Sequence, residues 1–565
     1  MKSPYEEKIW IKNYPSDMPA EIDIPVKSVN EIFDEVAEKY KNRDAIIFYG
    51  NTINFKTLHD KVLRLATALH DLGVRKGDRV AFVLLNSPEH IIALLATLRI
   101  GAVCTPVSPV YVSSEIKHQL EDSGAQFLIC QDILYSAVEK TGYEFKQIIL
   151  TNITESLPKL KKILGSTILK GVYQKMAAPP VEIYNRSSFH EFQDLIKKYQ
   201  PNPPVVEIDP MEDIVTLPYT GGTTGKPKGV MITHYNIVAN VKQLFTHISV
   251  LEEGNEVWIS YMPFYHAAGQ VVTVLNSIMH GFTMVVLTNP DVDEILYSIM
   301  RYKSKIFFGA PTMYEILKDY KKTDRVDWKS LKILISGADA LHEYTAKDWK
   351  DRTGADICEG FGQTETSSTT HLAFPRKVRI GSVGLPLPNT LAAIVDPDKD
   401  EYMPINEIGE IVVNGPQLTK GYWKNPQATQ DCVSEMNGIK WWRTGDLGYM
   451  DEDGFFYVYD RKRDLIKYKG LRVFAREVEE VIKIHPKVKE VGIIGVPDQK
   501  VGQNVKAMIV LETDARGNLS EQDIIDFCKD KLTPYKIPRI IEFVGEVPKT
   551  DIGKVSRREL REEEE

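Results

Sequence analysis

The sequence predicts an α/β protein with a large N-terminal domain of layered α/β sheets, a β-rich subdomain and a small α+β C-terminal domain. Three observations favour this fold. Amphipathic helical stretches alternate with short apolar runs in 26–130 and again in 214–341. Short strand patterns separated by turn signals follow up to residue 459. The charged run RKRD at 461–464 then precedes a small unit with its own strands and helices.

The elements of this prediction follow from periodicity. In the first layer, 29–40 and 55–72 have the spacing of amphipathic helices, and the apolar runs 79–85 and 125–130 predict strands. After residue 460 we expect strands at 491–496 and 505–511 and helices at 475–484 and 521–531. A length of 565 residues is enough for three or four structural units. Because the charged run at 461–464 precedes the small C-terminal unit, we divide the chain into domains at 1–460 and 461–565.

The segment 151–206 differs from its surroundings, because it is rich in lysine, ends in several prolines and has no strong strand signal. It is typical of an insertion or a long connector. Within 158–176, apolar residues recur every fourth position among lysines, which indicates a basic amphipathic helix. A helix of this kind can contact an anionic membrane surface. A helix lying on the protein's own surface is the alternative, and we favour it because Gly165 and Gly171 weaken the pattern.

Composition and charge exclude several classes of protein. With 43% hydrophobic residues, the chain is not expected to be disordered. Its net charge of −8 disfavours nucleic acid as a partner. The five cysteines form no CxxC pair, which favours a reducing, cytoplasmic compartment. The N-terminus lacks the apolar core of a signal peptide, and the most apolar stretch, 91–104, is interrupted by Arg99, so we expect no membrane span.

The strongest local signal is YTGGTTGKPKGV at 219–230, which is typical of a phosphate-binding loop. Glycines let the backbone N–H groups approach an anion, threonines add hydroxyl donors and lysines add positive charge. It is not a Walker A loop, because Pro227 stands where that motif needs Ser or Thr. A glycine-rich turn without a ligand is the alternative. The candidate residues are Thr220, Gly221, Gly222, Thr223, Thr224, Gly225, Lys226 and Lys228.

Three further stretches carry residues suited to a nucleotide. In EGFGQTET (359–366), the Glu365 carboxylate is suited to Mg²⁺ and the Phe361 ring to stacking on a base. In WRTGDLG (442–448), Asp446 can accept hydrogen bonds from both hydroxyls of a ribose. In PKTDIGKVSRR (548–558), Lys554 can deliver a point charge to a reaction centre. Each residue alone is more often a surface or turn residue, but the order and spacing of the four stretches favour a shared site.

Together these motifs resemble the AMP-forming acyl-CoA synthetase family of adenylate-forming enzymes, over about residues 26–560. Supporting stretches are NSPEHIIALLATLRIGAVCTPVSP (86–109), PFYHAAG (263–269), SGADAL (336–341) and DRKRDLIKYKGLRVFAREVE (460–479). The resemblance implies an acid–thiol ligase that uses ATP, Mg²⁺ and coenzyme A and works through an acyl-adenylate. It also implies that the C-terminal domain is a mobile lid, since the two half-reactions make opposite demands on one site.

The resemblance assigns roles to residues of this chain. The phosphate loop would hold the β- and γ-phosphates, and Thr364 with Glu365 the α-phosphate and Mg²⁺. Lys554 would bridge the attacking carboxylate and the α-phosphate. The pivot of the lid matches Arg463, where Asp or Lys is usual, and Phe361 replaces the commoner tyrosine. The remaining matches are Asp446 and Arg461 for ribose, Gly337 and Ala338 with Phe361 around adenine, Glu359 and Gly360 for the nucleotide, Arg472 for phosphate, and Lys469 and Gly470 for coenzyme A.

The acid itself is less well defined. His266 matches a gate beside the acyl pocket, and the helical run 270–280 is expected to line it, with Gln270, Thr273 and Ser277 on one face. Alanines at 267 and 268 replace the aspartate that amino-acid adenylating domains carry, which disfavours an amino acid. The N-terminal segment and the 151–206 insertion resemble the medium- and long-chain fatty acid branch, which we favour.

Other functions stay open at this point. The polar face of 270–280 would instead suit a short or hydroxylated aliphatic acid such as a hydroxybutyrate. An enzyme that loads a carrier protein is a second alternative, although the chain has no appended carrier domain. A non-catalytic nucleotide-binding scaffold is disfavoured, because Glu365, Asp446 and Lys554 are all intact. The sequence also leaves open a dimer and a peripheral membrane contact.

Overall fold

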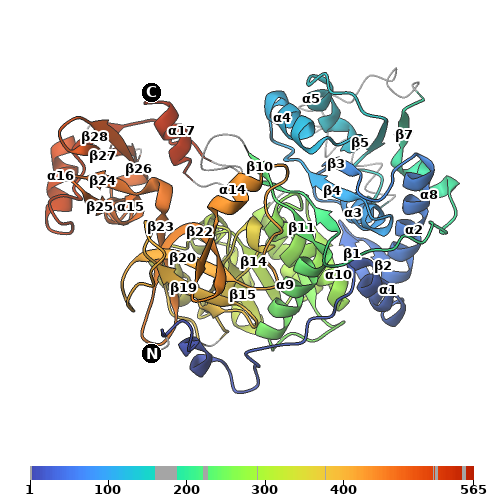
Figure 1. Ribbon diagram of the computed structural model, residues 1–565, viewed down its shortest axis with the longest axis horizontal. Helices are drawn as coiled ribbons and strands as arrows, with labels where there is room; N and C mark the ends of the chain where they lie inside the picture. The colour runs from blue at the N-terminus through green and yellow to red at the C-terminus, as the bar shows by residue number, and fades with distance from the viewer. Residues whose placement is uncertain are drawn as a thin grey trace.

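The computed structural model describes residues 3–158, 187–220, 227–288, 291–375, 377–512, 515, 519–549 and 555–564. In this part of the chain, two large sheets lie side by side in the N-terminal half, with a smaller antiparallel sheet next to them (Figure 1). A further sheet with its own helices stands at one end. These layers confirm the predicted α/β class, the β-rich subdomain and the small α+β unit at the C-terminus.

The nine-stranded sheet runs in the order β18-β17-β16-β15-β14-β12-β13-β1-β2. Strands β1, β12, β13, β14, β15 and β16 are parallel to one another, so their carboxyl ends share one edge, whereas β2 and β17 run antiparallel to β1 and β16. The strands are β1 Asp44–Phe48, β2 Asn51–Asn54, β12 Val257–Ser260, β13 Thr283–Val286, β14 Ile306–Gly309, β15 Ile333–Ser336, β16 Cys358–Phe361, β17 His371–Leu372 and β18 Leu385–Pro386.

The seven-stranded sheet runs in the order β11-β8-β4-β3-β5-β6-β7 and is parallel from β8 to β7. The strands predicted at 79–85 and 125–130 are confirmed as its β3 and β5. The strands are β3 Arg79–Val83, β4 Val103–Pro106, β5 Phe127–Gln131, β6 Gln147–Thr151, β7 Phe189–Glu191, β8 Ile214–Thr216 and β11 Ile232–Thr233.

Amphipathic helices cover these sheets, and their ends follow from capping residues. Helix α1 (Val29–Lys39) begins after Ser28, which forms a capping box with Glu31, and α2 (Phe55–Asp71) begins after Asn54, which caps Thr57. Both helices confirm the periodicity. The other helices of this part are α3 Pro88–Arg99, α4 Ser113–Ser123, α5 Tyr135–Glu139, α8 Phe192–Lys198, α9 His234–His247, α10 Asn276–His280, α11 Val292–Tyr302, α12 Pro311–Asp319 and α13 Glu343–Thr353.

The prediction that 151–206 is a connector is wrong for part of that segment. Strand β7 pairs in parallel with β6, and α8 follows it directly with Phe192, Leu195 and Ile196 buried. The short strand lacks a sequence signal because it has only three residues, and its pairing with β6 decides its conformation. The predicted basic helix at 158–176 lies outside the described residues except for Pro158. Among the described residues, none of the helices meets the length and apolarity that crossing a bilayer requires.

The β-rich subdomain predicted before residue 460 is a five-stranded antiparallel sheet. Strand β22 is its centre and pairs with β20, β21 and β23. The N-terminal segment packs against this sheet, since the Trp10 ring contacts Phe456 edge to face. The elements are β19 Leu391–Val395, β20 Gly409–Asn414, α14 Pro426–Asp431, β21 Val433–Met436, β22 Ile439–Met450 and β23 Phe456–Arg461.

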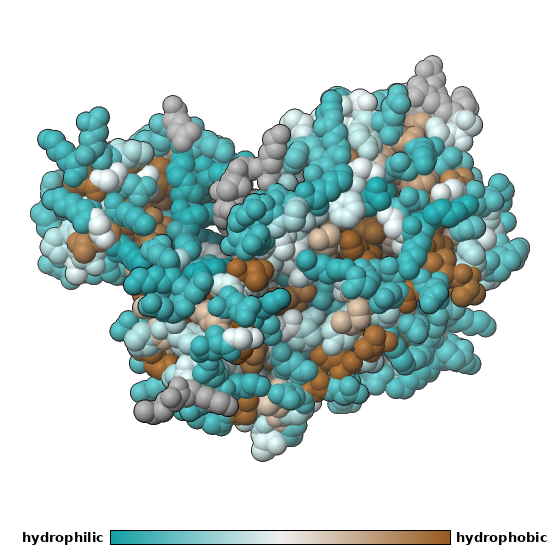
Figure 2. Space-filling view, viewed as in Figure 1, coloured by the Kyte–Doolittle hydropathy of each residue, from teal (hydrophilic) through white to brown (hydrophobic). Residues whose placement is uncertain are grey.

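The C-terminal unit has a separate sheet, in which β24, β26 and β28 each pair with β27, and a separate hydrophobic core. On the face drawn in Figure 2, a notch separates it from the rest of the molecule. We therefore propose that the domain boundary lies at 460–463, where β23 ends. The elements are β24 Ile466–Tyr468, β25 Leu471–Val473, α15 Ala475–Lys483, β26 Val488–Asp498, β27 Gly502–Leu511, α16 Glu521–Lys529, β28 Ile540–Phe543 and α17 Arg557–Glu562.

Candidate functional site

Two loops of the nine-stranded sheet meet where parallel strands β15 and β16 end. Ser336 and Glu359 are register partners, so the segments that follow them leave the sheet at the same edge. Ligands of open parallel sheets commonly bind at this edge. Gly337 and Ala338, predicted to flank adenine, come directly after β15, and Ala338 has a φ of 71°. Gly360, predicted to contact the nucleotide, and Phe361, predicted to flank adenine, are the last residues of β16.

Glu359 is buried and connects these two loops. Its Oε2 accepts a hydrogen bond from the backbone N–H of Leu341, 3.3 Å away. Burial raises the pKa of the Glu359 carboxyl to about 7, and the nearby charge of Arg476 opposes this shift. The contact indicates that Glu359 holds the 337–341 loop in place beside the strand that carries Phe361.

The turn that carries Glu365 is unusually tight. The 3₁₀ turn Thr364–Thr366 follows Gln363, whose backbone N–H donates to Thr366 Oγ1 at 2.9 Å. Ser368 has a φ of 147°, and a Cβ on Gly362 would lie only 1.8 Å from the Ser368 carbonyl oxygen. Glycine is therefore required at position 362, because any side chain there would displace the turn.

Two segments converge on Glu365, one that carries Thr220 and one that carries Thr419 and Tyr422. Its Oε1 accepts from the Tyr422 hydroxyl at 2.8 Å and from Thr220 Oγ1 at 3.5 Å. Its carbonyl oxygen accepts from the backbone N–H of Thr419 at 2.8 Å. The structure thus brings together two residues that the sequence predicted for one site, Thr220 and Glu365, and adds Tyr422.

The two ends of the predicted phosphate loop, on either side of 221–226, pair as short antiparallel strands. Strands β9 (Tyr219–Thr220) and β10 (Lys228–Gly229) pair with Thr220 opposite Lys228. The Lys228 ammonium lies 5.0 Å from the centre of the Tyr422 ring. Both ends of the loop therefore lie beside the Glu365 turn. The other predicted loop residues lie outside the described residues: Gly221, Gly222, Thr223, Thr224, Gly225 and Lys226.

The predicted ribose residues pair across the antiparallel sheet. Asp446 on β22 lies opposite Arg461 on β23, and Arg461 Nε is 2.6 Å from Asp446 Oδ1. The Asp446 carboxylate raises the pKa of the Arg461 guanidinium. Gln363 donates through Nε2 to Asp446 Oδ2 and, at 2.8 Å, to the Thr444 carbonyl. Gln363 therefore connects the Glu365 turn to this pair.

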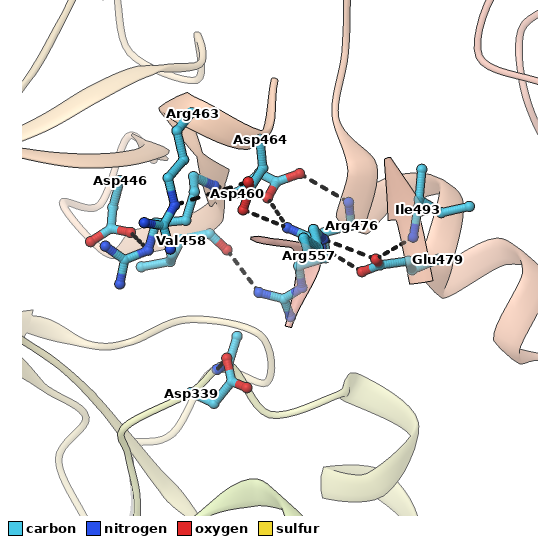
Figure 3. A network of polar contacts seen from close by, with 12 residues as sticks. Asp339, Asp446, Val458, Asp460, Arg463, Asp464, Arg476, Glu479, Ile493 and Arg557 are labelled. Carbon is cyan, nitrogen blue, oxygen red and sulfur yellow. Dashed lines mark hydrogen bonds and ion pairs between the residues drawn. The ribbon is translucent and has the colours of Figure 1, made fainter. Parts of the chain in front are cut away.

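An ion-pair network lies where the two domains join (Figure 3). The Arg557 guanidinium on α17 contacts carboxylates from β23, the following turn and α15: Asp460 at 2.7 Å, Asp464 at 3.3 Å and Glu479. Asp460 also accepts from the backbone N–H of Arg476 at 2.9 Å. The network fastens the start and the end of the C-terminal domain to the last strand of the body.

The residues predicted for the lid lie around this junction. The Nε of Arg463, the predicted pivot, lies 4.0 Å from Asp464 Oδ1 (Figure 3), and burial lowers the pKa of its guanidinium. Lys469 and Gly470 form the two-residue turn between β24 and β25, with φ of 49° and 78°. Arg472 on β25 pairs with Asp398, 3.2 Å away, on a turn of the body. Lys554 lies outside the described residues.

The predicted acyl-pocket residues lie on a π-helix, η4 (Ala268–Leu275), which continues into α10. We expected an α-helical face there, and this prediction is wrong for Gln270 and Thr273, which lie in the π-helical turns. A Cβ on Gly269 would lie 2.0 Å from the Pro263 carbonyl oxygen, so glycine lets the PFYHAAG segment cross close to this helix. His266 lies just before this helix, and its carbonyl accepts a hydrogen bond from the backbone N–H of Gln270 at 2.9 Å. π-Helical turns are frequent at functional sites.

The polar side chains of this helix are buried. Gln270 Nε2 lies 3.8 Å from Cys104 Sγ on β4. Within the described part of the chain, Thr273 Oγ1 and Ser277 Oγ have no hydrogen-bond partner, although both residues are at most 1% exposed. Buried hydroxyls without a partner are costly, which makes this helix a candidate for contact with a polar ligand group.

Two residues of the site were not identified from the sequence. Gln363 lies inside EGFGQTET, between two residues that were assigned, and only its long-range contact with Asp446 shows its position. Tyr422 stands in TKGYWKN, 57 residues after Glu365. Its neighbourhood has no charge or glycine pattern that would connect it with the phosphate loop.

Comparison with known protein families finds two matching models. One, described as AMP-binding enzyme, matches residues 33–423. The other, described as AMP-binding enzyme C-terminal domain, matches residues 477–554.

Similar proteins cover nearly the whole chain. A long-chain-fatty-acid–CoA ligase of Bacillus subtilis (strain 168) is 37% identical over 562 residues, which is 99% of this chain and 98% of that protein. The ligase of the same name from Escherichia coli O157:H7 is 34% identical, with the same shares covered. A probable 4-coumarate–CoA ligase 1 of Dictyostelium discoideum is 31% identical over 89% of each chain.

Solved structures share the fold. ATP-bound MatB from Rhodopseudomonas palustris superposes with a TM-score of 0.80 at 26% identity, covering 95% of this chain and 99% of that one. The anthranilate CoA ligase AuaEII in complex with anthranoyl-AMP gives a TM-score of 0.79 at 26% identity, covering 97% and 99%.

Proposed function

Because the chain belongs to the AMP-binding enzyme family, we propose that it is an AMP-forming acid–thiol ligase that joins a long-chain fatty acid to coenzyme A. The observation that carries this proposal is the convergence of Thr220, Lys228, Glu365 and Asp446 at one edge of the sheets. This arrangement combines hydroxyl and cationic groups for phosphates, a carboxylate for a metal and a carboxylate for a ribose.

The reaction has two steps. In the first, an oxygen of the fatty carboxylate attacks the α-phosphorus of ATP, the bond to the β-phosphate oxygen breaks, and pyrophosphate leaves. In the second, the coenzyme A thiol loses its proton and its sulfur attacks the acyl carbonyl carbon, and AMP leaves with the carboxyl oxygen. The chain's work in the first step is positioning and charge stabilisation, since phosphoryl-group substitution needs little covalent help.

The residues at Glu365 fit Mg²⁺. Hydroxyl oxygens of Thr220 and Tyr422 lie beside the Glu365 carboxylate, and Mg²⁺ prefers oxygen ligands. Among the described residues there is no group of three or more His, Cys, Asp or Glu that could hold a metal. Such a site suits a cation held by one carboxylate together with substrate phosphates. When bound, Mg²⁺ would neutralise charge on the leaving pyrophosphate.

The other roles follow from place in the fold. We propose that Thr364 and Glu365 face the α-phosphate and that Asp446 and Arg461 bind the ribose. Adenine is proposed to lie between Gly337–Ala338 and Phe361. For the residues outside the described chain, 221–226 are proposed to hold the β- and γ-phosphates and Lys554 to bridge the reacting carboxylate and phosphate. Lys469 and Gly470 are proposed to contact coenzyme A, and Arg472 a phosphate. The turn around Arg463 is proposed as the pivot.

A second candidate substrate is a short or hydroxylated acid. The buried Thr273 and Ser277 hydroxyls favour it, because an apolar chain would leave both without a partner. We place long-chain acids first, since ligases with that name are similar to this chain over nearly its full length.

The test is the release of AMP and pyrophosphate across acids of graded length and hydroxylation, with and without coenzyme A. We expect the highest kcat/KM for long saturated acids and a dependence of turnover on coenzyme A. A preference for hydroxylated short acids would support the second candidate. Turnover that coenzyme A fails to accelerate for every acid would exclude the ligase and favour transfer to a carrier protein.

A further inference from the structure

Tyr422 lies between the hairpin of the phosphate loop and the turn of Glu365. It belongs to the segment between β20 and α14, which is far in sequence from the hairpin and from the Glu365 turn. Only 8% of the residue is exposed, and its hydroxyl donates to Glu365 Oε1 at 2.8 Å.

The backbone around Tyr422 is fixed by the strand that leaves the phosphate loop. Tyr422 forms an antiparallel bridge with Val230. The Trp423 N–H donates to the Gly229 carbonyl at 2.8 Å, and the Met231 N–H donates to the Gly421 carbonyl at 2.9 Å. Any shift of this strand therefore moves the Tyr422 hydroxyl, and with it the carboxylate that it contacts.

The ring of Tyr422 contacts the same hairpin from its side chain. The Lys228 ammonium lies 5.0 Å from the ring centre, which fits a cation–π contact. Tyr422 thus contacts Lys228 through its ring and Glu365 through its hydroxyl.

The chemistry of this donor matters for a metal ligand. A lysine or arginine in the same place would orient the carboxylate but would also cancel its charge. Tyrosine is a neutral donor, and its hydroxyl donates to Glu365 Oε1 without bringing a positive charge. The carboxylate is then held in one orientation while its negative charge stays available to a cation.

From these contacts we propose that Tyr422 is a positioning residue, which holds the Glu365 carboxylate in the orientation that receives Mg²⁺ with the nucleotide and couples that orientation to the phosphate hairpin. The inference rests on the proposed function only in that Glu365 faces Mg²⁺·ATP.

The test is the affinity for ATP in the absence of any acid, measured by isothermal titration calorimetry with saturating MgCl₂ and again with EDTA. For Tyr422→Phe we expect about tenfold weaker binding with Mg²⁺, because one hydrogen bond to a charged group is lost. Binding with EDTA is expected to stay unchanged. Equal weakening in both conditions, or no weakening, would overturn the proposal.

A matched control removes a hydroxyl–carboxylate hydrogen bond elsewhere. Tyr320 Oη donates to Asp293 at 2.6 Å in a different part of the fold. Tyr320→Phe is expected to bind ATP as the wild type does in both conditions. A Mg²⁺-specific loss in this control would also count against the proposal.

A double-mutant cycle tests whether Tyr422 acts through Glu365. Adding Tyr422→Phe to Glu365→Gln is expected to weaken Mg²⁺·ATP binding no further than Glu365→Gln alone, whereas additive losses would contradict the proposal. If phenylalanine lowers the Tm, Tyr422→Leu, which also lacks the hydroxyl, replaces it in the same cycle with the same criterion. A wild type that binds Mg²⁺·ATP but activates no acid would refute the proposed function, and the titration would still decide the role of Tyr422.

Discussion

At the residue scale, Glu359 is the clearest case of a buried acid whose ionisation opposes folding. Its pKa in the folded chain is about 7, above the ordinary value of 4.5, because the carboxyl is buried. Between these two values the folded state binds more protons than the unfolded state, so raising the pH from 5 to 8 removes stability.

Replacement by glutamine removes this ionisation and keeps the shape. We expect Glu359→Gln to gain stability over the wild type between pH 5 and pH 8, by on the order of 3 kcal/mol, from about 1.4 kcal/mol per unit of pKa. Thermal unfolding of both proteins at the two pH values measures it. Glu435→Gln, at an exposed position, is the control and should show no such trend. A constant difference between wild type and Glu359→Gln at both pH values would contradict the raised pKa.

Gly362 is the residue on which the Glu365 turn depends. A methyl group at this position meets the Ser368 carbonyl oxygen, so the turn must move and carry Glu365 with it. For Gly362→Ala we expect acid-dependent AMP release to fall on the order of a hundredfold, since displacements of about 1 Å have that cost.

The control for this substitution is Gly545→Ala, where an added Cβ meets nothing within 4 Å. It should leave AMP release unchanged. Full activity of Gly362→Ala would show that the turn tolerates a side chain and that the tight approach does not position Glu365.

Residues of the site were predicted from the sequence where chemistry is concentrated in a short motif. Glu365, Asp446 and Thr220 were each identified from a local pattern, and the structure places all three in one region. Gln363 and Tyr422 were not identified, because their roles come from contacts across 83 and 57 residues of sequence. Local patterns carry no information on such contacts.

At the scale of elements, the sequence predicted helices whose apolar residues recur with the helical period and strands that are short, continuous apolar runs. Helices α1 and α2 and strands β3 and β5 agree with the prediction to within a few residues. Strand β7 was missed because three residues are too short for a period, and its partner β6 supplies the order. The π-helix η4 was read as α-helical, because the sequence shows no break where Gly269 lets Pro263 approach.

Helix α17 is held by one arginine, and its neighbour provides a matched control. Arg557 is mostly buried among Asp460, Asp464 and Glu479. Arg557→Ala leaves the buried Asp460 and Glu479 without their cation, whereas Asp464 keeps Arg561. We expect a loss of about 3–5 kcal/mol from the C-terminal domain. Arg558 is half exposed and pairs with Glu562. We expect Arg558→Ala to lower the free energy of unfolding by less than about 1 kcal/mol.

Limited proteolysis and thermal unfolding distinguish these two variants. Arg557→Ala is expected to expose the C-terminal domain to cleavage at lower temperature than Arg558→Ala. Equal stability of the two variants would mean that the carboxylates of the network do not depend on Arg557.

At the scale of the whole molecule, the two domains share one reaction, and Lys554 is the proposed contribution of the C-terminal domain to the first step only. We expect Lys554→Ala to lose most acid-dependent adenylation but to keep most thioester formation from supplied acyl-AMP. The two half-reactions are measured separately, by AMP-forming turnover and by thioester release from acyl-AMP and coenzyme A. Equal loss in both would contradict a role confined to adenylation.

The domain layout was predicted because composition changes at the junction, where the run RKRD follows a strand. The strands from β24 onward form a separate sheet with its own core, and the boundary at 460–463 stays a prediction. The arrangement of the domains was not predictable, because it depends on contacts such as Arg557 with Asp460, 97 residues apart.

The central claim is that the molecule activates an acid as its adenylate, and acid-dependent exchange of labelled pyrophosphate into ATP tests it most directly. Without coenzyme A, we expect exchange that requires both Mg²⁺ and a long-chain fatty acid and that Glu365→Gln reduces strongly. Exchange that proceeds without acid, or formation of ADP and phosphate in place of AMP and pyrophosphate, would contradict the account.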